Sequence, residues 1–145
     1  MIRFLLDSSA LWRLLCEDKV RAAWAEIITA GAVGSCHPQR IELRRSARDL
    51  DEYEQMTEMF DKLYADVPVP KSAWRWIEGA QYRLLRAGAH RALSAVDLLI
   101  CATAAAHGLV VLHDDGDFIT AARQLTDLRE RSIYDTPPSS DVARW

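Results

Sequence analysis

Two short apolar runs, each ending abruptly at aspartate, constrain the fold of this chain more than any other feature. Residues 2–6 read IRFLL and stop at Asp7, and residues 109–113 read LVVLH and stop at a second acidic stretch. Apolar runs of this length suit strands that are buried on both faces of a parallel sheet. Helical segments lie between the runs, so the chain predicts strand–helix units around a parallel sheet.

The helices are expected from the spacing of apolar residues and from signals at their ends. Ser8 and Ser9 offer N-caps for a first helix and Ser94 for a later one, while Gly31 and Gly108 follow the last turns of two helices. The expected helices cover residues 10–17, 20–30, 38–50, 51–65, 74–87, 95–107 and 118–125. The further expected strands cover residues 32–36 and 131–135.

The helix expected over residues 51–65 is amphipathic. Its apolar stripe consists of Tyr53, Met56, Met59, Phe60 and Leu63. Such a stripe is expected to face the core.

Length and composition fit one globular domain. The chain has 145 residues, of which 50% are hydrophobic and 27% charged. These values exclude disordered and fibrous classes. We expect a single domain over residues 1–135 and a mobile tail, rich in proline and serine, over residues 136–145.

The chain shows no sign of export or membrane insertion. The N-terminal apolar run is too short for a signal peptide or a spanning helix. The three cysteines form no CxxC pair, so neither a zinc knuckle nor a disulfide framework is indicated. We therefore expect a cytoplasmic protein with free thiols.

Several acidic residues have an ordinary structural explanation when each is taken alone. Asp7 could cap a helix, and Asp97 completes a capping box with Ser94. Glu42 could belong to a solvated helix face, and residues 114–117 (DDGD) could form a turn.

Taken together, the same acids point to a metal site. Parallel strands bring their carboxyl ends to one edge, where sites form in open α/β sheets. Crowded carboxylates raise one another's pKa, and a bound cation keeps them ionised most easily. Carboxylate oxygens suit hard cations such as Mg²⁺ or Mn²⁺.

This arrangement resembles the PIN-domain ribonucleases, and specifically the VapC toxins of bacterial toxin–antitoxin pairs. The resemblance runs from Ile2 to Tyr134 and rests on three strings: LLDSSALW, HPQRIELRRSAR and HRALSAVDLLICATAAAHGLVVLHDDGDF. It implies a PIN-like three-layer α/β/α sandwich with a central, mostly parallel sheet of about five short strands.

The resemblance also implies the roles of individual residues. The catalytic acids would be Asp7, Glu42, Asp97, Asp115 and Asp117. Three of them would lie nearest the metal: Asp7, Asp97 and Asp115. Ser9 would support the site, and Asp114 falls where the family varies, so it is expected to be peripheral. Metal ligation by His113 would depart from the family pattern and is left open.

The implied reaction is hydrolysis of RNA phosphodiester bonds by one or two Mg²⁺ or Mn²⁺ ions. The family also implies a cognate VapB-type antitoxin, which would dock near Trp12. A homodimer is expected, with a heterotetramer or larger complex forming on antitoxin binding, and no membrane partner.

Arginines flank the proposed acids on both sides in the sequence. Fifteen of the 18 basic residues are arginine, whose planar fork suits phosphate. They could simply neutralise local acids, or they could guide RNA toward the site. The candidates for RNA contact are Arg40, Arg44, Arg45, Arg86 and Arg91.

Other classes of protein fit the sequence less well. A dehalogenase-type phosphatase needs a second aspartate where Ser9 stands, and a receiver domain needs a lysine that is missing here. Walker A and GxGxxG loops are also missing. The best alternative is a non-catalytic PIN-like module that binds metal or RNA.

The bulk charge is compatible with this interpretation. The net charge is −3, and nucleic-acid-binding domains usually have a basic excess. Six acids are expected at the site, however, and the remaining 15 acidic residues against 18 basic ones would give +3. The acidity is thus expected to be local.

Overall fold

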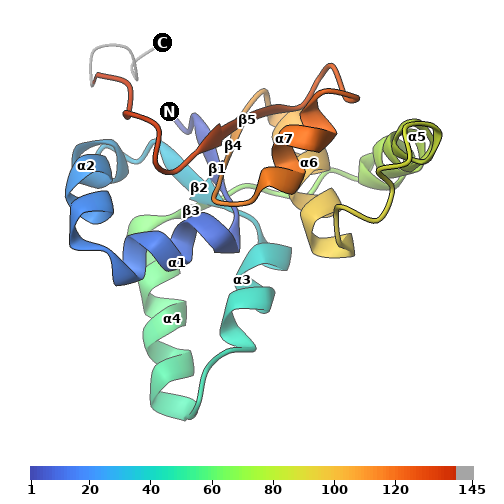
Figure 1. Cartoon of the computed structure of the whole chain (residues 1–145). Coiled ribbons are helices and arrows are strands. Elements are labelled where there is room, and N and C mark those ends of the chain that lie inside the picture. The colour runs from blue at the N-terminus through green and yellow to red at the C-terminus, as the bar shows by residue number, and fades with distance from the viewer. Residues whose placement is uncertain (140–145) are drawn as a thin grey trace.

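Five short strands form one sheet in the order β3-β2-β1-β4-β5, and every neighbouring pair is parallel. The computed structural model describes residues 1–139 (Figure 1). The strands are β1 (Phe4–Leu6), β2 (Val33–Ser35), β3 (Ala65–Asp66), β4 (Val110–His113) and β5 (Arg129–Ser132). The expectation of a parallel sheet of about five short strands is confirmed.

Helices connect the strands and cover both faces of the sheet (Figure 1). They are α1 (Ser8–Cys16), α2 (Asp18–Thr29), α3 (His37–Arg44), α4 (Leu50–Leu63), α5 (Ala73–Arg86), α6 (Ala95–His107) and α7 (Gly116–Ala122).

The core consists of two apolar clusters, one on each face of the sheet. Phe4, Leu6 and Leu112 face one way and pack against α1, α2, α3 and α4. Leu5 and Val111 face the other way and pack against α5, α6 and α7. Alternate residues of the same strands thus belong to different clusters, because successive side chains of a strand point to opposite faces. This arrangement is the expected three-layer sandwich.

The central strands β1 and β4 bring their carboxyl ends together. Leu6 lies opposite Leu112 in the register, and the Asp7 backbone N–H donates to the Leu112 carbonyl oxygen at 2.9 Å. The residues that follow the two strands therefore start from neighbouring points at one edge of the sheet. This pairing is what places the acidic segments side by side.

The expected helix over residues 38–50 is wrong in its second half. The structure ends α3 at Arg44 and starts α4 at Leu50. The Asp49 side chain accepts a hydrogen bond from the Glu52 backbone N–H at 2.8 Å and so caps a new helix. Strand β3 (Ala65–Asp66) was not predicted, because Ala65 was assigned to the end of the helix expected over residues 51–65.

Other boundaries also shift. The N-cap of α1 is Asp7 and not Ser8 or Ser9. The last strand covers Arg129–Ser132 rather than residues 131–135, and α7 begins at Gly116 rather than residue 118. Ser94 and Gly108 cap α6 as expected, with Gly108 at φ 67°.

The apolar stripe of α4 is only partly buried. Phe60 is buried, whereas Tyr53 and Leu63 are 44% and 46% exposed. The prediction that all five stripe residues face the core is therefore wrong. Tyr53 belongs to the first turn of α4, which extends beyond the sheet (Figure 1), and Leu63 is the last residue of the helix.

Two further expectations concern the thiols and the tail. The three cysteines are free, with Cys36 and Cys101 buried and Cys16 exposed. No helix within residues 1–139 is long and apolar enough to cross a membrane. Of the predicted mobile tail, residues 136–139 have no regular secondary structure, and residues 140–145 lie outside the described residues.

Candidate active site

Asp7 follows β1 and is buried at the acidic edge of the sheet, with 4% of its surface exposed. Its Oδ2 accepts hydrogen bonds from the Ser9 backbone N–H at 3.0 Å and from Ser9 Oγ at 2.5 Å. Its Oδ1 is buried and has no hydrogen-bond partner within the described residues. Burial raises the pKa of Asp7 to about 6, with smaller upward contributions from the charges of Asp97 and Glu42.

Ser9 connects the ends of the two central strands. Its hydroxyl donates to Asp7 and also accepts a hydrogen bond from the Asp114 backbone N–H at 2.8 Å. The hydroxyl therefore orients the buried carboxylate and holds the segment after β4 beside it. The supporting role of Ser9 at a metal site stays a prediction.

Asp97 stands in the first turn of α6 and forms the expected capping box. The Ser94 backbone N–H donates to Asp97 Oδ2 at 2.9 Å, and the Asp97 backbone N–H donates to Ser94 Oγ at 3.1 Å. Burial raises the pKa of Asp97, and the charges of Asp115 and Asp117 raise it further. Capping thus occupies one oxygen of Asp97 and leaves Oδ1 for another ligand.

Asp115 and Asp117 lie at the start of α7. The Asp115 side chain caps this helix through Oδ1, which accepts a hydrogen bond from the Asp117 backbone N–H at 2.9 Å. The negative charges of both carboxylates raise the pKa of Asp97, so the α7 acids interact electrostatically with the start of α6. The charges of the acids that follow β4 therefore act on the acid of α6.

His113 holds the segment after β4 and is not directed at the acids as a ligand. Its Nδ1 accepts a hydrogen bond from the Asp115 backbone N–H at 3.1 Å, so the ring proton lies on Nε2, 3.3 Å from Glu130 Oε1. The buried ring also stacks on Phe118, with the ring centroids 5.1 Å apart. Both ring nitrogens thus have hydrogen-bonding partners in this structure.

Glu42 and Asp114 differ in their relation to the site. Glu42 lies half-buried on α3, which packs on α6, and its charge raises the pKa of Asp7. Asp114 instead accepts a hydrogen bond from Arg13 Nε at 2.7 Å, in a partly exposed ion pair. Asp114 is therefore paired with Arg13, and its peripheral role stays a prediction.

Gln39 is a buried polar residue beside the segment that follows β1, and it was not considered in the sequence analysis. Its fully buried side chain donates from Nε2 to Ser8 Oγ at 3.1 Å, and its Oε1 has no partner within the described residues. Gln39 lies three residues before Glu42 and therefore on the same side of α3. That spacing is the signal that could have revealed it.

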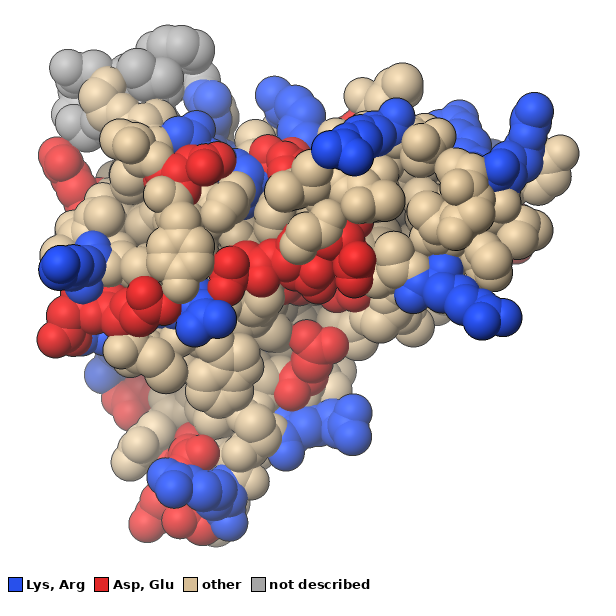
Figure 2. Space-filling model, viewed as in Figure 1, with Lys and Arg blue, Asp and Glu red and all other residues tan. Residues whose placement is uncertain are grey.

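The donor set suits a hard cation. Figure 2 shows acidic side chains gathered in the middle of this face, with Lys and Arg side chains around its margin. Asp7 Oδ1 is an orphaned buried oxygen, and oxygen ligands are those that Mg²⁺ and Mn²⁺ prefer. Within residues 1–139, however, no three His, Cys, Asp or Glu side chains already converge on one point.

One predicted RNA contact is placed inside the fold. Arg40 is buried, and its Nε donates to Ser35 Oγ at 2.7 Å while Nη2 donates to the Tyr64 carbonyl oxygen at 2.8 Å. Its guanidinium also lies over Phe60, 5.2 Å from the ring centroid. These contacts make Arg40 a structural residue, so its expected role at an RNA surface is corrected.

The other four arginines are accessible to different degrees. Arg45, Arg86 and Arg91 are exposed, and Arg44 is half-buried. Arg86 Cζ lies 5.9 Å from the centroid of the Tyr82 ring. These side chains stay candidates for RNA contact.

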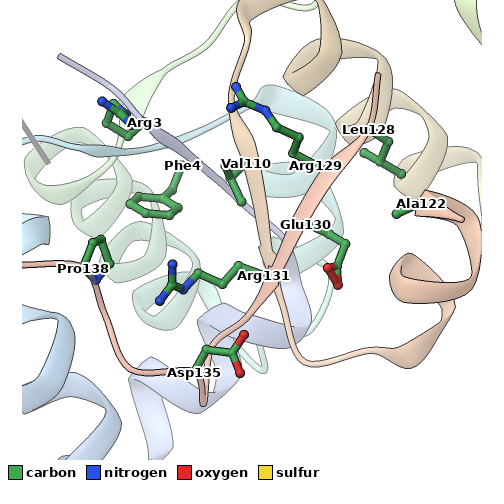
Figure 3. Close-up of a pocket in the computed structure, with 10 residues that line it drawn as sticks. All are labelled: Arg3, Phe4, Val110, Ala122, Leu128, Arg129, Glu130, Arg131, Asp135 and Pro138. Atoms are coloured by element: carbon green, nitrogen blue, oxygen red, sulfur yellow. The ribbon is translucent and has the colours of Figure 1, made fainter. Parts of the chain in front are cut away.

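A pocket of about 690 Å³ is lined by none of the candidate acids (Figure 3). Arg3 and Phe4, at the start of β1, and Val110, the first residue of β4, line it together with Arg129 and Arg131 of the edge strand β5. Asp7 stands at the opposite end of β1. The pocket is therefore separate from the candidate active site.

The fold and the acidic edge define a PIN-domain protein. A family model described as the PIN domain matches residues 4–124. Because this match covers most of the chain, the protein belongs to the PIN-domain family and, on the relatives that follow, to its VapC branch.

Two relatives from Mycobacterium tuberculosis (strain ATCC 25618 / H37Rv) support this family assignment. Ribonuclease VapC6 is 66% identical over 102 residues, which is 70% of this chain and 80% of the relative. Ribonuclease VapC51 is 37% identical over 120 residues, which is 81% of this chain and 83% of the relative.

Solved structures show the same fold at low sequence identity. DNA-bound VapBC from Salmonella typhimurium has a TM-score of 0.72 at 15% identity and covers 92% of this chain and 99% of that one. VapBC-5 from Mycobacterium tuberculosis, a member of the VapBC family of toxin–antitoxin systems, has a TM-score of 0.61 at 21% identity and covers 91% of this chain and 99% of that one.

Proposed function

We propose that this protein is the toxin of a toxin–antitoxin pair and acts as an Mg²⁺- or Mn²⁺-dependent endoribonuclease. The observation that carries the proposal is the buried Asp7 carboxylate, which keeps one oxygen without a partner within the described residues and lies in the field of Asp97 and Glu42. A fold accepts such a group at a cost unless a cation offsets it. Similarity to ribonucleases of the VapC family supports the choice of RNA as substrate.

The residues have distinct roles in this proposal. Asp7, Asp97 and Asp115 would hold the ion, and Glu42 and Asp117 would reach it directly or through water. The ion, when bound, supplies Lewis-acid chemistry and offsets negative charge that develops on the phosphodiester.

The chain's own groups prepare the site for that ion. Ser9 orients Asp7 through its 2.5 Å hydrogen bond, and the Ser94 capping box fixes the direction of Asp97. Helix capping also turns Asp115 so that only one of its oxygens is occupied. The carboxylates therefore do not have to be ordered when substrate arrives, which lowers the entropic cost of the reaction.

A VapB-type antitoxin is the proposed partner. The solved structures with this fold include VapBC complexes from Salmonella typhimurium and nontypeable Haemophilus influenzae. A homodimer, a heterotetramer with antitoxin and a cytoplasmic location stay predictions from the family resemblance.

RNA cleavage by purified, antitoxin-free protein tests the function. Total cellular RNA is incubated with Mg²⁺ or Mn²⁺, with EDTA, and with the Asp7→Asn variant. We expect discrete cleavage products only with metal and only from the unaltered protein. If metal makes no difference on any cellular RNA while the protein still binds RNA, the chain is the non-catalytic PIN-like module.

A further inference from the structure

The surface between the end of α3 and the start of α4 contains a small pocket that none of the candidate acids lines. Four side chains from α3 and the first turn of α4 line it: Ile41, Arg44, Arg45 and Tyr53. Its volume is about 190 Å³. A space of this size admits one planar ring system but no helix or strand.

An aromatic ring and an aliphatic side chain form the apolar part of this Tyr53 pocket. Tyr53 is 44% exposed and Ile41 is 55% exposed, although both are large hydrophobic residues. The Arg44 guanidinium lies over the Tyr53 ring, with Cζ 5.3 Å from the ring centroid. Exposed aromatic rings and guanidinium planes are the surfaces on which unpaired nucleobases stack.

The charge of the pocket is positive and uncompensated. Arg44 Nη1 donates one long hydrogen bond of 3.4 Å to Thr57 Oγ1, and Arg45 is exposed. Within residues 1–139 neither guanidinium pairs with a carboxylate, whereas Arg48 nearby lies 3.0 Å from Glu52. The pocket is therefore prepared for an anionic ligand that also has a flat apolar surface.

The position of the pocket links it to the acidic edge. Arg45, the C-cap residue of α3, follows Glu42 by three residues in helical backbone, so these two side chains are neighbours on the helix surface. The negative charge of Glu42 in turn raises the pKa of Asp7, so these two carboxylates interact electrostatically. A single RNA strand that reaches the acids with one phosphate can place a neighbouring nucleotide against Tyr53.

We propose that the Tyr53 pocket binds an unpaired nucleobase of the RNA substrate beside the scissile phosphate. The base stacks on Tyr53 and Arg44, and Arg45 contacts the adjoining phosphate. This inference rests on the proposed ribonuclease function and adds a subsite to it. Because a base must leave its stack to enter, the substrate bound here is single-stranded.

RNA affinity separates stacking from charge. The inactive Asp7→Asn protein is titrated into a fluorescein-labelled single-stranded oligouridylate of about ten nucleotides at several salt concentrations. Adding Tyr53→Leu should weaken binding by roughly 5- to 100-fold with an unchanged salt slope, since stacking releases no counterions. Adding Arg45→Gln should weaken binding and lower the slope by about one.

Two further variants control for the change at Tyr53. Tyr53→Phe retains the ring and should bind like the parent. Tyr134 is also an exposed tyrosine, but its hydroxyl donates to Glu17 Oε2 at 2.7 Å and, within the described residues, it contacts none of the candidate RNA-binding arginines. Tyr134→Leu should therefore leave the affinity unchanged.

Photo-cross-linking locates the base directly. An oligouridylate that contains 5-iodouridine is irradiated with the Asp7→Asn protein, and mass spectrometry should find the adduct on Tyr53. The inference is overturned if Tyr53→Leu binds RNA like the parent, including the case in which that variant loses only a VapB-type antitoxin. If the unaltered protein neither binds nor cleaves RNA in Mg²⁺ or Mn²⁺, the proposed function fails together with the subsite.

Discussion

Ser9 Oγ lies 2.5 Å from Asp7 Oδ2, so one hydroxyl holds a carboxylate that has almost no contact with solvent. This hydrogen bond lowers the pKa of Asp7 and opposes the larger upward shift that burial causes. The ionised form that a cation needs therefore depends in part on a neutral side chain two residues away.

Removing that hydroxyl should make the activity more sensitive to acid. We expect Ser9→Ala to raise the pKa of Asp7 above its value of about 6, because a hydrogen bond to the charged form is lost. RNA cleavage should fall by about tenfold at pH 6, and less at pH 8, where Asp7 ionises in both proteins. A pH–rate profile checks this, and Ser9→Thr should restore the original profile. A uniform loss at all pH values would contradict it.

The buried charge should also cost stability in the metal-free protein. The folded-state pKa of Asp7, about 6, is raised above its ordinary value of 3.8. The folded state is therefore favoured by this group at low pH and loses that contribution as the pH rises through 6. We expect Asp7→Asn to increase the free energy of unfolding at pH 7.5 by up to about 3 kcal/mol.

Urea denaturation in EDTA at a series of pH values measures this effect. The gain from Asp7→Asn should shrink between pH 6 and pH 4, where the unaltered carboxyl becomes protonated. Asp114→Asn is the matched control, because Asp114 is partly exposed and pairs with Arg13. A gain that does not change with pH would argue against a raised Asp7 pKa.

Divalent cations should stabilise the protein through the same acids. Mg²⁺ or Mn²⁺ at about 100 times its dissociation constant should add roughly 2.7 kcal/mol, which corresponds to a rise of several degrees in Tm. Differential scanning fluorimetry should show this rise for the unaltered protein and for Asp135→Asn, an exposed residue of the separate pocket. It should be lost in Asp97→Asn. An equal rise in that variant would place the ion elsewhere.

Arg40 should matter for folding rather than for RNA. Arg40→Leu leaves the Ser35 hydroxyl and the Tyr64 carbonyl without their donor, so we expect the free energy of unfolding to fall by about 2–4 kcal/mol. Arg45→Gln, at an exposed site, should change it by less than about 0.5 kcal/mol. Chemical denaturation of the two variants measures the difference. Similar values for both would contradict the structural role of Arg40.

The local sequence predicted most of the secondary structure because its signals are local. The apolar runs that end at Asp7 and at the 114–117 segment became β1 and β4, and the Ser94 capping box formed as expected. The break between α3 and α4 was predicted after residue 50, but the structure places it after Arg44, because Asp49 caps the new helix.

In the candidate site, too, some features follow from the local sequence and others from tertiary packing. The sequence by itself determined which acids follow the strands and begin the helices, since capping and strand ends depend on neighbouring residues. Three features depended on the tertiary structure alone. The Ser9 hydroxyl connects the segments that follow β1 and β4, and the His113 ring nitrogens bond to Asp115 and Glu130. The Arg40 side chain is buried and bonds to Ser35. These outcomes depend on contacts between segments that are distant in sequence or on burial, and the packing of the sheet and helices sets both.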